Sequence, residues 1–138
     1  METIIVQDTD QTVLEMLTAA LEMDNFEVYP LMDCDADFLS LIDQLRPHVV
    51  MMDYPLRGEH CLAACRRIKE KYPHLPVIAS SCNSNIHQEY DKLGFDGYIE
   101  KPFDLDLLYR ILRKHIPKPA GNPTWLILQV ISDIYSLK

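Results

Sequence analysis

Apolar runs of strand length alternate with helical patterns along most of the chain, and this alternation restricts the fold more than any other feature. The runs cover residues 3–6, 26–31, 48–52, 76–80 and 97–100. After each run, apolar residues recur at three- and four-residue spacing, as on one face of a helix. Strands that alternate with helices form a parallel sheet that the helices cover on both faces through right-handed crossovers. The sequence therefore predicts an α/β protein.

The character of the runs predicts the order of the strands. Run 48–52 is continuously apolar, as in a strand buried on both faces, whereas Pro30 in run 26–31 is typical of an edge strand. We expect a flavodoxin-like (βα)5 doubly wound parallel sheet of order 2-1-3-4-5, with a fourth helix over 86–93. The expected helix caps and stops are Asp10, Asp104 and Gly94.

The composition is that of a globular protein, and it excludes several functions. The 138 residues carry 13 Lys and Arg against 21 Asp and Glu, a net charge of −8, with 48% hydrophobic residues. This content supports a core of its own, and the acidic balance argues against direct nucleic-acid binding. No apolar run reaches the roughly 18 residues of a membrane span, and the start lacks the basic region of a signal peptide. We expect a cytoplasmic protein that does not enter a membrane.

The four cysteines do not predict a metal site. Cys34, Cys61, Cys65 and Cys82 show no CxxC spacing and do not fit a zinc site. Cys61 and Cys65 lie one helical turn apart and face the same way, so a metal pair there is an alternative. Because small buried thiols are common in protein cores, we expect them to serve packing.

Polar residues follow four of the predicted strands at the points where these strands end. Asp8 follows the first strand, Asp53 the third, Ser81 the fourth and Lys101 the fifth. The carboxyl ends of parallel strands meet at one rim, where such sheets hold their sites. Two carboxylates suit a hard cation such as Mg²⁺, and a hydroxyl with an ammonium suits phosphoryl oxygens. The pattern favours a carboxylate nucleophile that accepts phosphate, although a single Asp at a strand end is more often a helix cap.

Four motifs follow one another in an order known from one family. They are the acidic turn Gln7-Asp8, Val49-Val50-Met51-Met52-Asp53, Pro76-Val77-Ile78-Ala79-Ser80-Ser81, and Tyr98-Ile99-Glu100-Lys101-Pro102-Phe103. With these motifs the chain resembles a response regulator receiver domain, the CheY-like family, which we place at residues 1–117. The resemblance implies a phosphorylation-controlled switch of a two-component phosphorelay. Such a domain is not an enzyme beyond its own phosphorylation and dephosphorylation.

The resemblance also implies roles for single residues around the acceptor. Asp53 is the phosphoacceptor, which attacks the phosphorus of a phosphohistidine on a histidine kinase or phosphotransfer protein. Asp8, Asp53 and the backbone carbonyl of Pro55 bind Mg²⁺, and Gln7 is a further candidate that acts through a water. Lys101 pairs with Asp53 before the reaction and with the phosphoryl oxygens afterwards.

The switch that this family uses implies two further residues and a surface. Ser81 moves to donate a hydrogen bond to the phosphoryl group, and Tyr98 swings inward to fill the space. The Lys101–Pro102 bond is expected to be cis. Residues 84–115 form the surface for a downstream output protein or for a second copy of the chain.

Several positions depart from the family pattern. Gln7 stands where a second acidic residue is usual, so Mg²⁺ should bind more weakly. The turn after Asp53 lacks the usual Met-Pro pair and the downstream Asp-Gly pair, which changes the shape of this loop. Cys82 replaces Ala or Gly, and we expect it to pack. Asn83 and Pro55 occupy the positions that tune dephosphorylation.

Two other functions stay open at this point. A degenerate receiver, without phosphate chemistry, would act as a protein-interaction module. A flavodoxin-like cofactor binder of the same topology would need a hydroxyl-rich phosphate loop after the first strand. The anionic residues Asp8 and Asp10 stand in that loop and would repel phosphate.

The end of the chain differs from the rest in composition. Residues 118–123 are expected to be a Pro- and Gly-rich linker, and residues 124–138 to form an apolar C-terminal helix. Such a helix must be covered, by the receiver domain, by a second copy or by a downstream domain that it begins. No helix-turn-helix or ATP-binding loop is apparent, so the output is expected to be a partner or a dimer.

Overall fold

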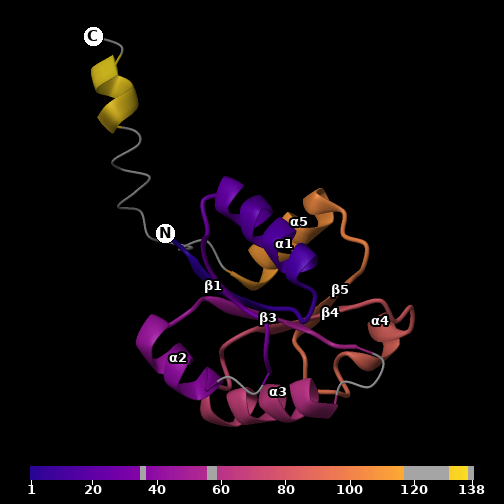
Figure 1. The fold of residues 1–138 in the computed structure, drawn as a ribbon. Coiled ribbons are helices and arrows are strands. Elements are labelled where there is room, and N and C mark those ends of the chain that lie inside the picture. Colours follow the sequence, from indigo (N-terminus) through magenta and orange to yellow (C-terminus); the bar gives the residue numbers. More distant parts are fainter. Residues whose placement is uncertain (35–36, 56–58, 117–130, 137–138) are drawn as a thin grey trace.

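The computed structural model describes residues 1–34, 37–55, 59–116 and 131–136, and these ranges contain a five-stranded sheet with helices on both faces (Figure 1). The strands are β1 (Thr3–Gln7), β2 (Glu27–Leu31), β3 (Val49–Asp53), β4 (Val77–Ser81) and β5 (Gly97–Glu100). The helices between and after them are α1 (Gln11–Met23), α2 (Phe38–Leu45), α3 (Glu59–Lys71), α4 (Ile86–Glu89) and α5 (Leu105–His115).

The strand order is β2-β1-β3-β4-β5, and every neighbouring pair is parallel. The predicted fold and order are therefore confirmed. β1, β3 and β4 are buried along their whole length, as their apolar runs require. β2 is one of the two edge strands, and it tolerates Pro30 because one side of the strand needs no ladder hydrogen bonds.

Two cores, one on each face of the sheet, hold the helices in place. On one face α1 and α5 pack through leucines such as Leu17, Leu21, Leu108 and Leu112. On the other face α2, α3 and α4 bury Phe38, Ile42, Ile68 and Ile86. Figure 1 shows these two layers on opposite sides of the strands. The carboxyl ends of the strands are thus fixed relative to one another by the helices that follow them.

The helix ends follow local hydrogen bonding. Asp10 and Asp104 cap α1 and α5 through side-chain oxygens that accept backbone N–H groups, as predicted. α4 is shorter than the predicted 86–93. It ends at Glu89, and a turn continues to Gly94. In that turn the Asp91 side chain accepts the N–H of Lys92, and such local bonds compete with the helical ladder. Gly94 closes the turn with a φ of +99°.

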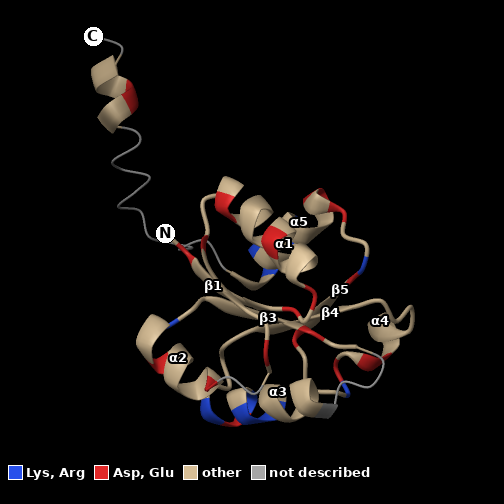
Figure 2. Cartoon of the chain, viewed as in Figure 1, with Lys and Arg blue, Asp and Glu red and all other residues tan. Residues whose placement is uncertain are grey.

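Lys and Arg collect on α3, where the carboxylates are few, although the chain as a whole is acidic (Figure 2). Lys69 forms an ion pair with Asp96, and Lys71 forms one with Asp43 on α2. These pairs lie on the outside of the molecule, away from the rim of the sheet.

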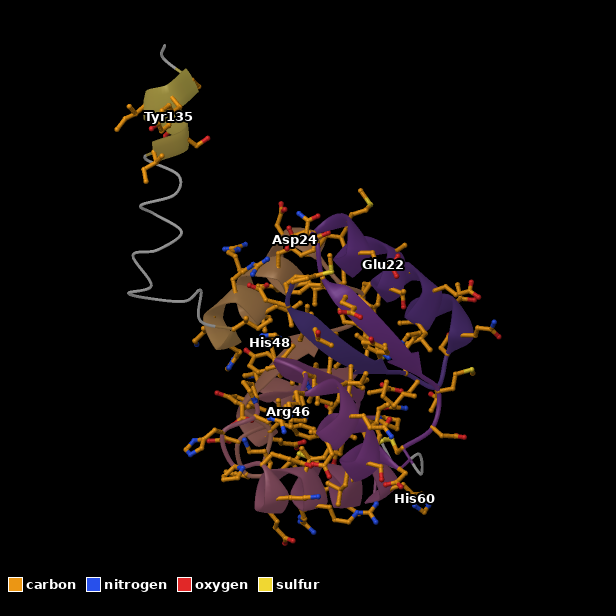
Figure 3. The ribbon with its side chains drawn as sticks, turned by 90° about the vertical axis from the view of Figure 1, so that its left-hand side faces the viewer. Glu22, Asp24, Arg46, His48, His60 and Tyr135 are labelled. Carbon is orange, nitrogen blue, oxygen red and sulfur yellow. A yellow bond between two sulfur atoms is a disulfide. The ribbon has the colours of Figure 1, made fainter. Side chains whose placement is uncertain are left out.

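A helix covers residues 131–136, and its residues are exposed, Tyr135 among them (Figure 3). The expected extra C-terminal helix is therefore present in this part of the chain. The linker 118–123 and the remainder of 124–138 lie outside the described residues. Of the helices that the structure describes, none has the length and apolar content needed to span a bilayer.

Gly97 at the start of β5 is a position where a side chain has no room. A Cβ there would lie 2.7 Å from His115 Nε2 and 3.0 Å from Ile78 Cδ1. We expect Gly97→Ala to lower the free energy of unfolding by about 1–3 kcal/mol, measured by urea denaturation, because the core must shift. Adding His115→Ala should recover part of this loss. An unchanged stability of Gly97→Ala would contradict the packing described here.

Candidate functional site

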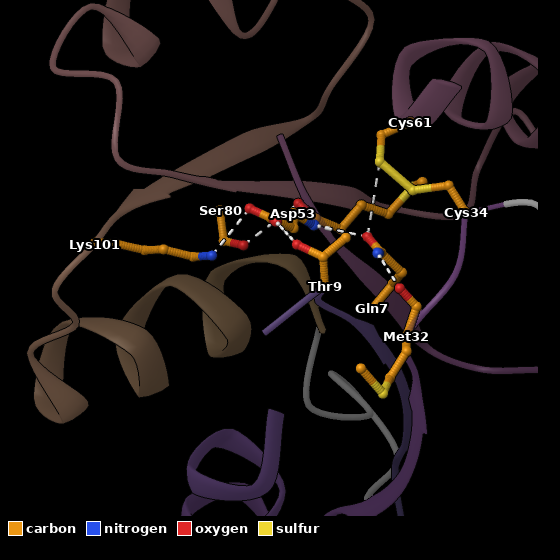
Figure 4. Close-up of a disulfide and its surroundings, with 9 residues drawn as sticks. Gln7, Thr9, Met32, Cys34, Asp53, Cys61, Ser80 and Lys101 are labelled. Atoms are coloured by element: carbon orange, nitrogen blue, oxygen red, sulfur yellow. Dashed lines mark hydrogen bonds and ion pairs between the residues drawn. A yellow bond between two sulfur atoms is a disulfide. The ribbon is translucent and has the colours of Figure 1, made fainter. Parts of the chain in front are cut away.

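Buried polar side chains gather at the carboxyl end of the sheet. In the described part of the chain they are Thr3, Gln7, Asp8, Asp53, Ser80 and Ser81. All but Thr3 stand at or just after the ends of β1, β3 and β4. Burying polar groups costs free energy unless they are paired, so their collection at one rim marks a site. Lys101 reaches the same place from the end of β5 (Figure 4).

The ammonium of Lys101 lies between two carboxylates. Its Nζ is 2.6 Å from Asp8 Oδ2 and 2.9 Å from Asp53 Oδ1. The side chain of Lys101 is 14% exposed, and those of Asp8 and Asp53 are 0% and 8% exposed. Burial on its own would lower the pKa of Lys101, but the hydrogen bonds with Asp8 and Asp53 outweigh this and raise the pKa. The ammonium is therefore kept charged between two carboxylates, and the three groups carry a net charge of −1.

Asp53 is held by contacts at three of its atoms. Besides Lys101 at Oδ1, the hydroxyl of Thr9 donates to Oδ2 at 3.2 Å. The backbone N–H of Asp53 donates to Gln7 Oε1 at 3.1 Å. The carboxylate is thus oriented by an ammonium and a hydroxyl. Sequence reasoning assigned no role to Thr9, although a hydroxyl residue in the acidic turn after β1 was a signal for one.

Gln7 is wholly buried, and both polar atoms of its amide have protein contacts. Nε2 donates to the carbonyl of Met32 at 3.1 Å, while Oε1 accepts from Asp53. Gln7 therefore connects the end of β3 with the loop after β2. Gln7 therefore supports the backbone of Asp53, a role that its sequence context did not indicate.

A disulfide between Cys34 and Cys61 lies directly beside Gln7 (Figure 4). The sequence-based expectation that these cysteines are buried thiols that serve packing is wrong for this pair. The alternative of a metal pair between Cys61 and Cys65 is also wrong, because Cys61 is bonded to Cys34 and Cys65 is a buried free thiol. The pairing escaped prediction because the two cysteines are 27 residues apart and meet only when α3 packs beside the loop after β2.

Ser81 and Tyr98, the expected switch residues, lie on neighbouring strands. Ser81 is buried, and its hydroxyl accepts the N–H of Asn83, while its carbonyl accepts the N–H of Lys101. Tyr98 is half-buried, and its ring packs against Tyr90 with centroids 4.9 Å apart. Tyr98 also lines a groove of about 550 Å³ between β5 and α5. The Lys101–Pro102 bond is cis.

Cys82 is exposed, which corrects the expectation that it packs. It lines a hollow of about 320 Å³ with Lys101 and apolar side chains of α1 and of the segment after β5. Cys82 comes directly after β4, whose last two residues are buried serines, so the burial of the strand ends before it. Pro55, the proposed source of a carbonyl ligand, is exposed two residues beyond Asp53.

The donor set of the rim fits a magnesium ion. Mg²⁺ is usually held by one or two carboxylates, with waters and substrate phosphates completing its shell. Asp8 and Asp53 supply two buried carboxylates that both contact the ammonium of Lys101. One ammonium does not neutralise two carboxylates, so negative charge remains for a cation. Within the described ranges, no group of three or more His, Cys, Asp and Glu side chains is placed to hold a metal.

Comparison with known proteins gives the same family for sequence and structure. The model of the response regulator receiver domain family matches residues 4–113. The receiver domain of NtrX from Brucella abortus is 28% identical, with a TM-score of 0.72, over 82% of this chain and 97% of that one. A response regulator from Thermotoga maritima is also 28% identical, with a TM-score of 0.72, over 85% of this chain and 98% of that one.

NtrX from Brucella abortus in complex with ATP is 26% identical, with a TM-score of 0.73 over 96% of this chain. The match covers 29% of that NtrX chain, so the present chain spans less than a third of the length of this relative. Receiver domains are phosphoacceptor switches that bind Mg²⁺ for phosphorylation, which agrees with the carboxylates and ammonium found at the rim. The family match covers most of the chain, and the chain therefore belongs to the response regulator receiver domain family.

Proposed function

We propose that this chain is a signalling switch that accepts a phosphoryl group on Asp53 from a phosphohistidine, with Mg²⁺ bound at Asp8, Asp53 and the Pro55 carbonyl. The observation that carries the proposal is the pair of buried carboxylates that share the ammonium of Lys101 at 2.6 and 2.9 Å. The ammonium is in direct contact with both carboxylates, and this arrangement supports the roles of nucleophile, cation ligand and charged donor that we propose.

The residues at the rim divide the chemistry between them. A carboxylate oxygen of Asp53 attacks phosphorus, an O–P bond forms, and the N–P bond to the donor imidazole breaks with its electron pair going to nitrogen. Thr9 and Lys101 hold the carboxylate in place before the attack. Lys101 is also within reach of the new phosphoryl oxygens, where its charge stabilises the product. Bound Mg²⁺ would offset the negative charge on the transferred group.

The switch proposed for this chain uses Ser81 and Tyr98. After phosphorylation the hydroxyl of Ser81 leaves the N–H of Asn83 and donates to the phosphoryl group. Tyr98 then moves inward from its contact with Tyr90. A ligand shifts such an equilibrium only through contacts that one state has and the other lacks, and the Ser81 bond is such a contact.

The partners follow from this chemistry. A histidine kinase or phosphotransfer protein in the cytoplasm supplies the phosphoryl group. The surface over residues 84–115 passes the signal to an output protein or to a second copy of the chain, and the C-terminal helix is a further candidate for the contact between copies.

A second function is favoured by one observation at Gln7. Gln7 replaces an acidic residue, and both of its polar atoms are already engaged within the protein. A site that binds Mg²⁺ too weakly would leave the chain as a phosphate-independent interaction module. The two functions differ in whether Asp53 can be phosphorylated.

Acetyl phosphate with Mg²⁺ tests the proposal directly. We expect the intact mass of the protein to increase by one phosphoryl group, and the gain to disappear when EDTA removes the metal. Beryllofluoride with Mg²⁺ should shift the backbone amide signals of Ser81 and Lys101. If the protein shows no mass gain and no amide shift, even at high Mg²⁺, the result would support the interaction module instead.

A further inference from the structure

The disulfide joins two segments that flank the acceptor. Cys34 lies three residues after the end of β2, and Cys61 lies in the first turn of α3. The bond therefore closes a loop of the chain that contains α2, β3 and Asp53. Both cysteines are almost covered, at 8% and 5% exposed. Breaking or forming this bond therefore alters the contacts that hold β3, the strand that carries Asp53.

Gln7 is the link between the disulfide and Asp53. Its Nε2 binds the carbonyl of Met32, two residues before Cys34, and its Oε1 lies 3.9 Å from Cys61 Sγ. The same Oε1 accepts the N–H of Asp53 at 3.1 Å (Figure 4). Because Gln7 is wholly buried, water cannot replace a contact that it loses. If either cysteine moves, the side chain of Gln7 can transmit the displacement to the backbone of Asp53.

The contact between Cys61 and Gln7 depends on the redox state of the sulfur. A disulfide sulfur carries no proton, so in the bonded state Cys61 donates nothing to Gln7 Oε1. A thiol at the same place is a weak donor, and it would share Oε1 with the N–H of Asp53. Reduction also frees the segment that holds Met32 from α3. Both effects weaken the hold of Gln7 on Asp53.

The fold does not require this disulfide for its stability. Disulfides are essential mainly in small domains whose cores are insufficient, whereas this chain has a core on each face of its sheet. The nearby thiol of Cys65 does not compete for the pairing, because burial raises its pKa to about 12 and keeps it protonated. The bond between Cys34 and Cys61 is thus a single, well-defined pair placed beside the acceptor.

We propose that Cys34 and Cys61 are a reversible redox modification site whose state is transmitted through Gln7 to Asp53. Bond formation removes two electrons and two protons from the two thiols. A small disulfide such as oxidised glutathione takes them through a mixed disulfide and leaves as two thiols. In the cytoplasm, where we place the proposed function, disulfides are usually transient. The effect of the disulfide on phosphorylation rests on the proposed function, whereas its coupling to the backbone of Asp53 does not.

Reversibility is tested by equilibrating the full chain in glutathione buffers of different redox ratio. After denaturation and alkylation with N-ethylmaleimide, the intact mass counts the free thiols. We expect peptide mapping to find Cys34 and Cys61 joined in oxidising buffer and both modified by N-ethylmaleimide in reducing buffer, with full return when the buffer is exchanged. The same state of this pair at every ratio, or a change that does not return, would rule out a reversible site.

Coupling is tested by amide hydrogen exchange at two neighbouring residues. The N–H of Asp53 is held by Gln7, whereas the N–H of Tyr54 is held by the carbonyl of Ser80 at 2.8 Å. On reduction we expect exchange at Asp53 to accelerate by about ten-fold relative to Tyr54, because only the first hydrogen bond depends on the disulfide. An unchanged ratio of the two exchange rates would overturn the coupling.

Two variants separate the disulfide from general effects of mutation. Cys34→Ser should show the exchange ratio of the reduced protein in every buffer. Cys65→Ser changes a buried cysteine of α3, the helix of Cys61, that forms no disulfide, and it should respond to redox as the wild type does. If Cys34→Ser does not fold, the reduced wild type supplies the same comparison. A redox response that persists in folded Cys34→Ser would refute the assignment.

Labelling with acetyl phosphate relates the coupling to the proposed function. We expect the oxidised protein to be labelled at least about three-fold faster than the reduced protein, since its acceptor is better positioned. Equal rates would overturn control of the acceptor by the disulfide. Absence of labelling in both states would count against the proposed function, while the exchange experiment would still decide the coupling.

Discussion

Asp53→Asn should abolish the gain of a phosphoryl group from acetyl phosphate while the fold stays intact. The substitution keeps the volume of the side chain and removes its nucleophilic carboxylate. The amide oxygen can still accept from Lys101, and the amide nitrogen can still donate to Thr9, so the local contacts survive. Asp8 and Lys101 then form a neutral pair, so the free energy of unfolding should stay equal or increase. Intact mass and urea denaturation measure the two effects.

The matched control is Asp43→Asn. Asp43 is exposed on α2 and pairs with Lys71, away from the rim. This variant should be labelled as fully as the wild type. Labelling of Asp53→Asn at the wild-type level would show that another residue accepts the phosphoryl group.

Lys101→Ala should lower the free energy of unfolding by about 3 kcal/mol near neutral pH. Removal of one partner from a buried charge cluster leaves the others uncompensated, and here two carboxylates would face each other. Added Mg²⁺ should restore part of the lost stability, because a ligand that binds the folded state stabilises it by mass action. Urea denaturation with and without Mg²⁺ measures both effects.

Lys71→Ala is the control for a lysine in an ion pair. Lys71 and Asp43 have side chains that are 49% and 54% exposed, and such surface pairs contribute at most about 1 kcal/mol. A loss in Lys101→Ala no larger than that in Lys71→Ala would contradict the role given to the buried cluster.

The pH dependence of the Lys101 contribution has a definite sign. The pKa of Lys101 is raised above its ordinary 10.5 in the folded protein, despite burial, by its hydrogen bonds with Asp8 and Asp53. The ammonium therefore stabilises the folded state fully below pH 10.5, and this stabilisation is lost as the pH rises through the higher pKa of the folded state. The stability difference between wild type and Lys101→Ala should stay constant from neutral pH to about pH 10 and shrink above it.

The fold could be predicted because its signals are local. The continuous burial of β3, the edge position of Pro30 and the capping by Asp10 each follow from a few neighbouring residues. α4 is the exception, since its apolar spacing is weak and a side-chain bond from Asp91 competes with the helix. Where local signals conflict, periodicity alone does not determine where a helix ends.

Only part of the site could be predicted from the sequence. The strand ends identified Asp8, Asp53 and Lys101 as neighbours at one rim, because parallel strands bring their carboxyl ends together. Thr9 was missed because an exposed hydroxyl in a turn is common, and its bond to Asp53 depends on how two strand ends face each other.

The sequence by itself determined which segments become strands and helices, in what order they pair, and which polar residues stand at the strand ends. These properties depend on spacing along the chain, which any folded form of the sequence retains. Only the tertiary structure decided that Lys101 also binds Asp8, which is 93 positions away in the sequence, and that Cys34 meets Cys61 beside Gln7. Such contacts are set by the packing of helices across the sheet, which brings distant residues within ångströms and has no counterpart in a local pattern.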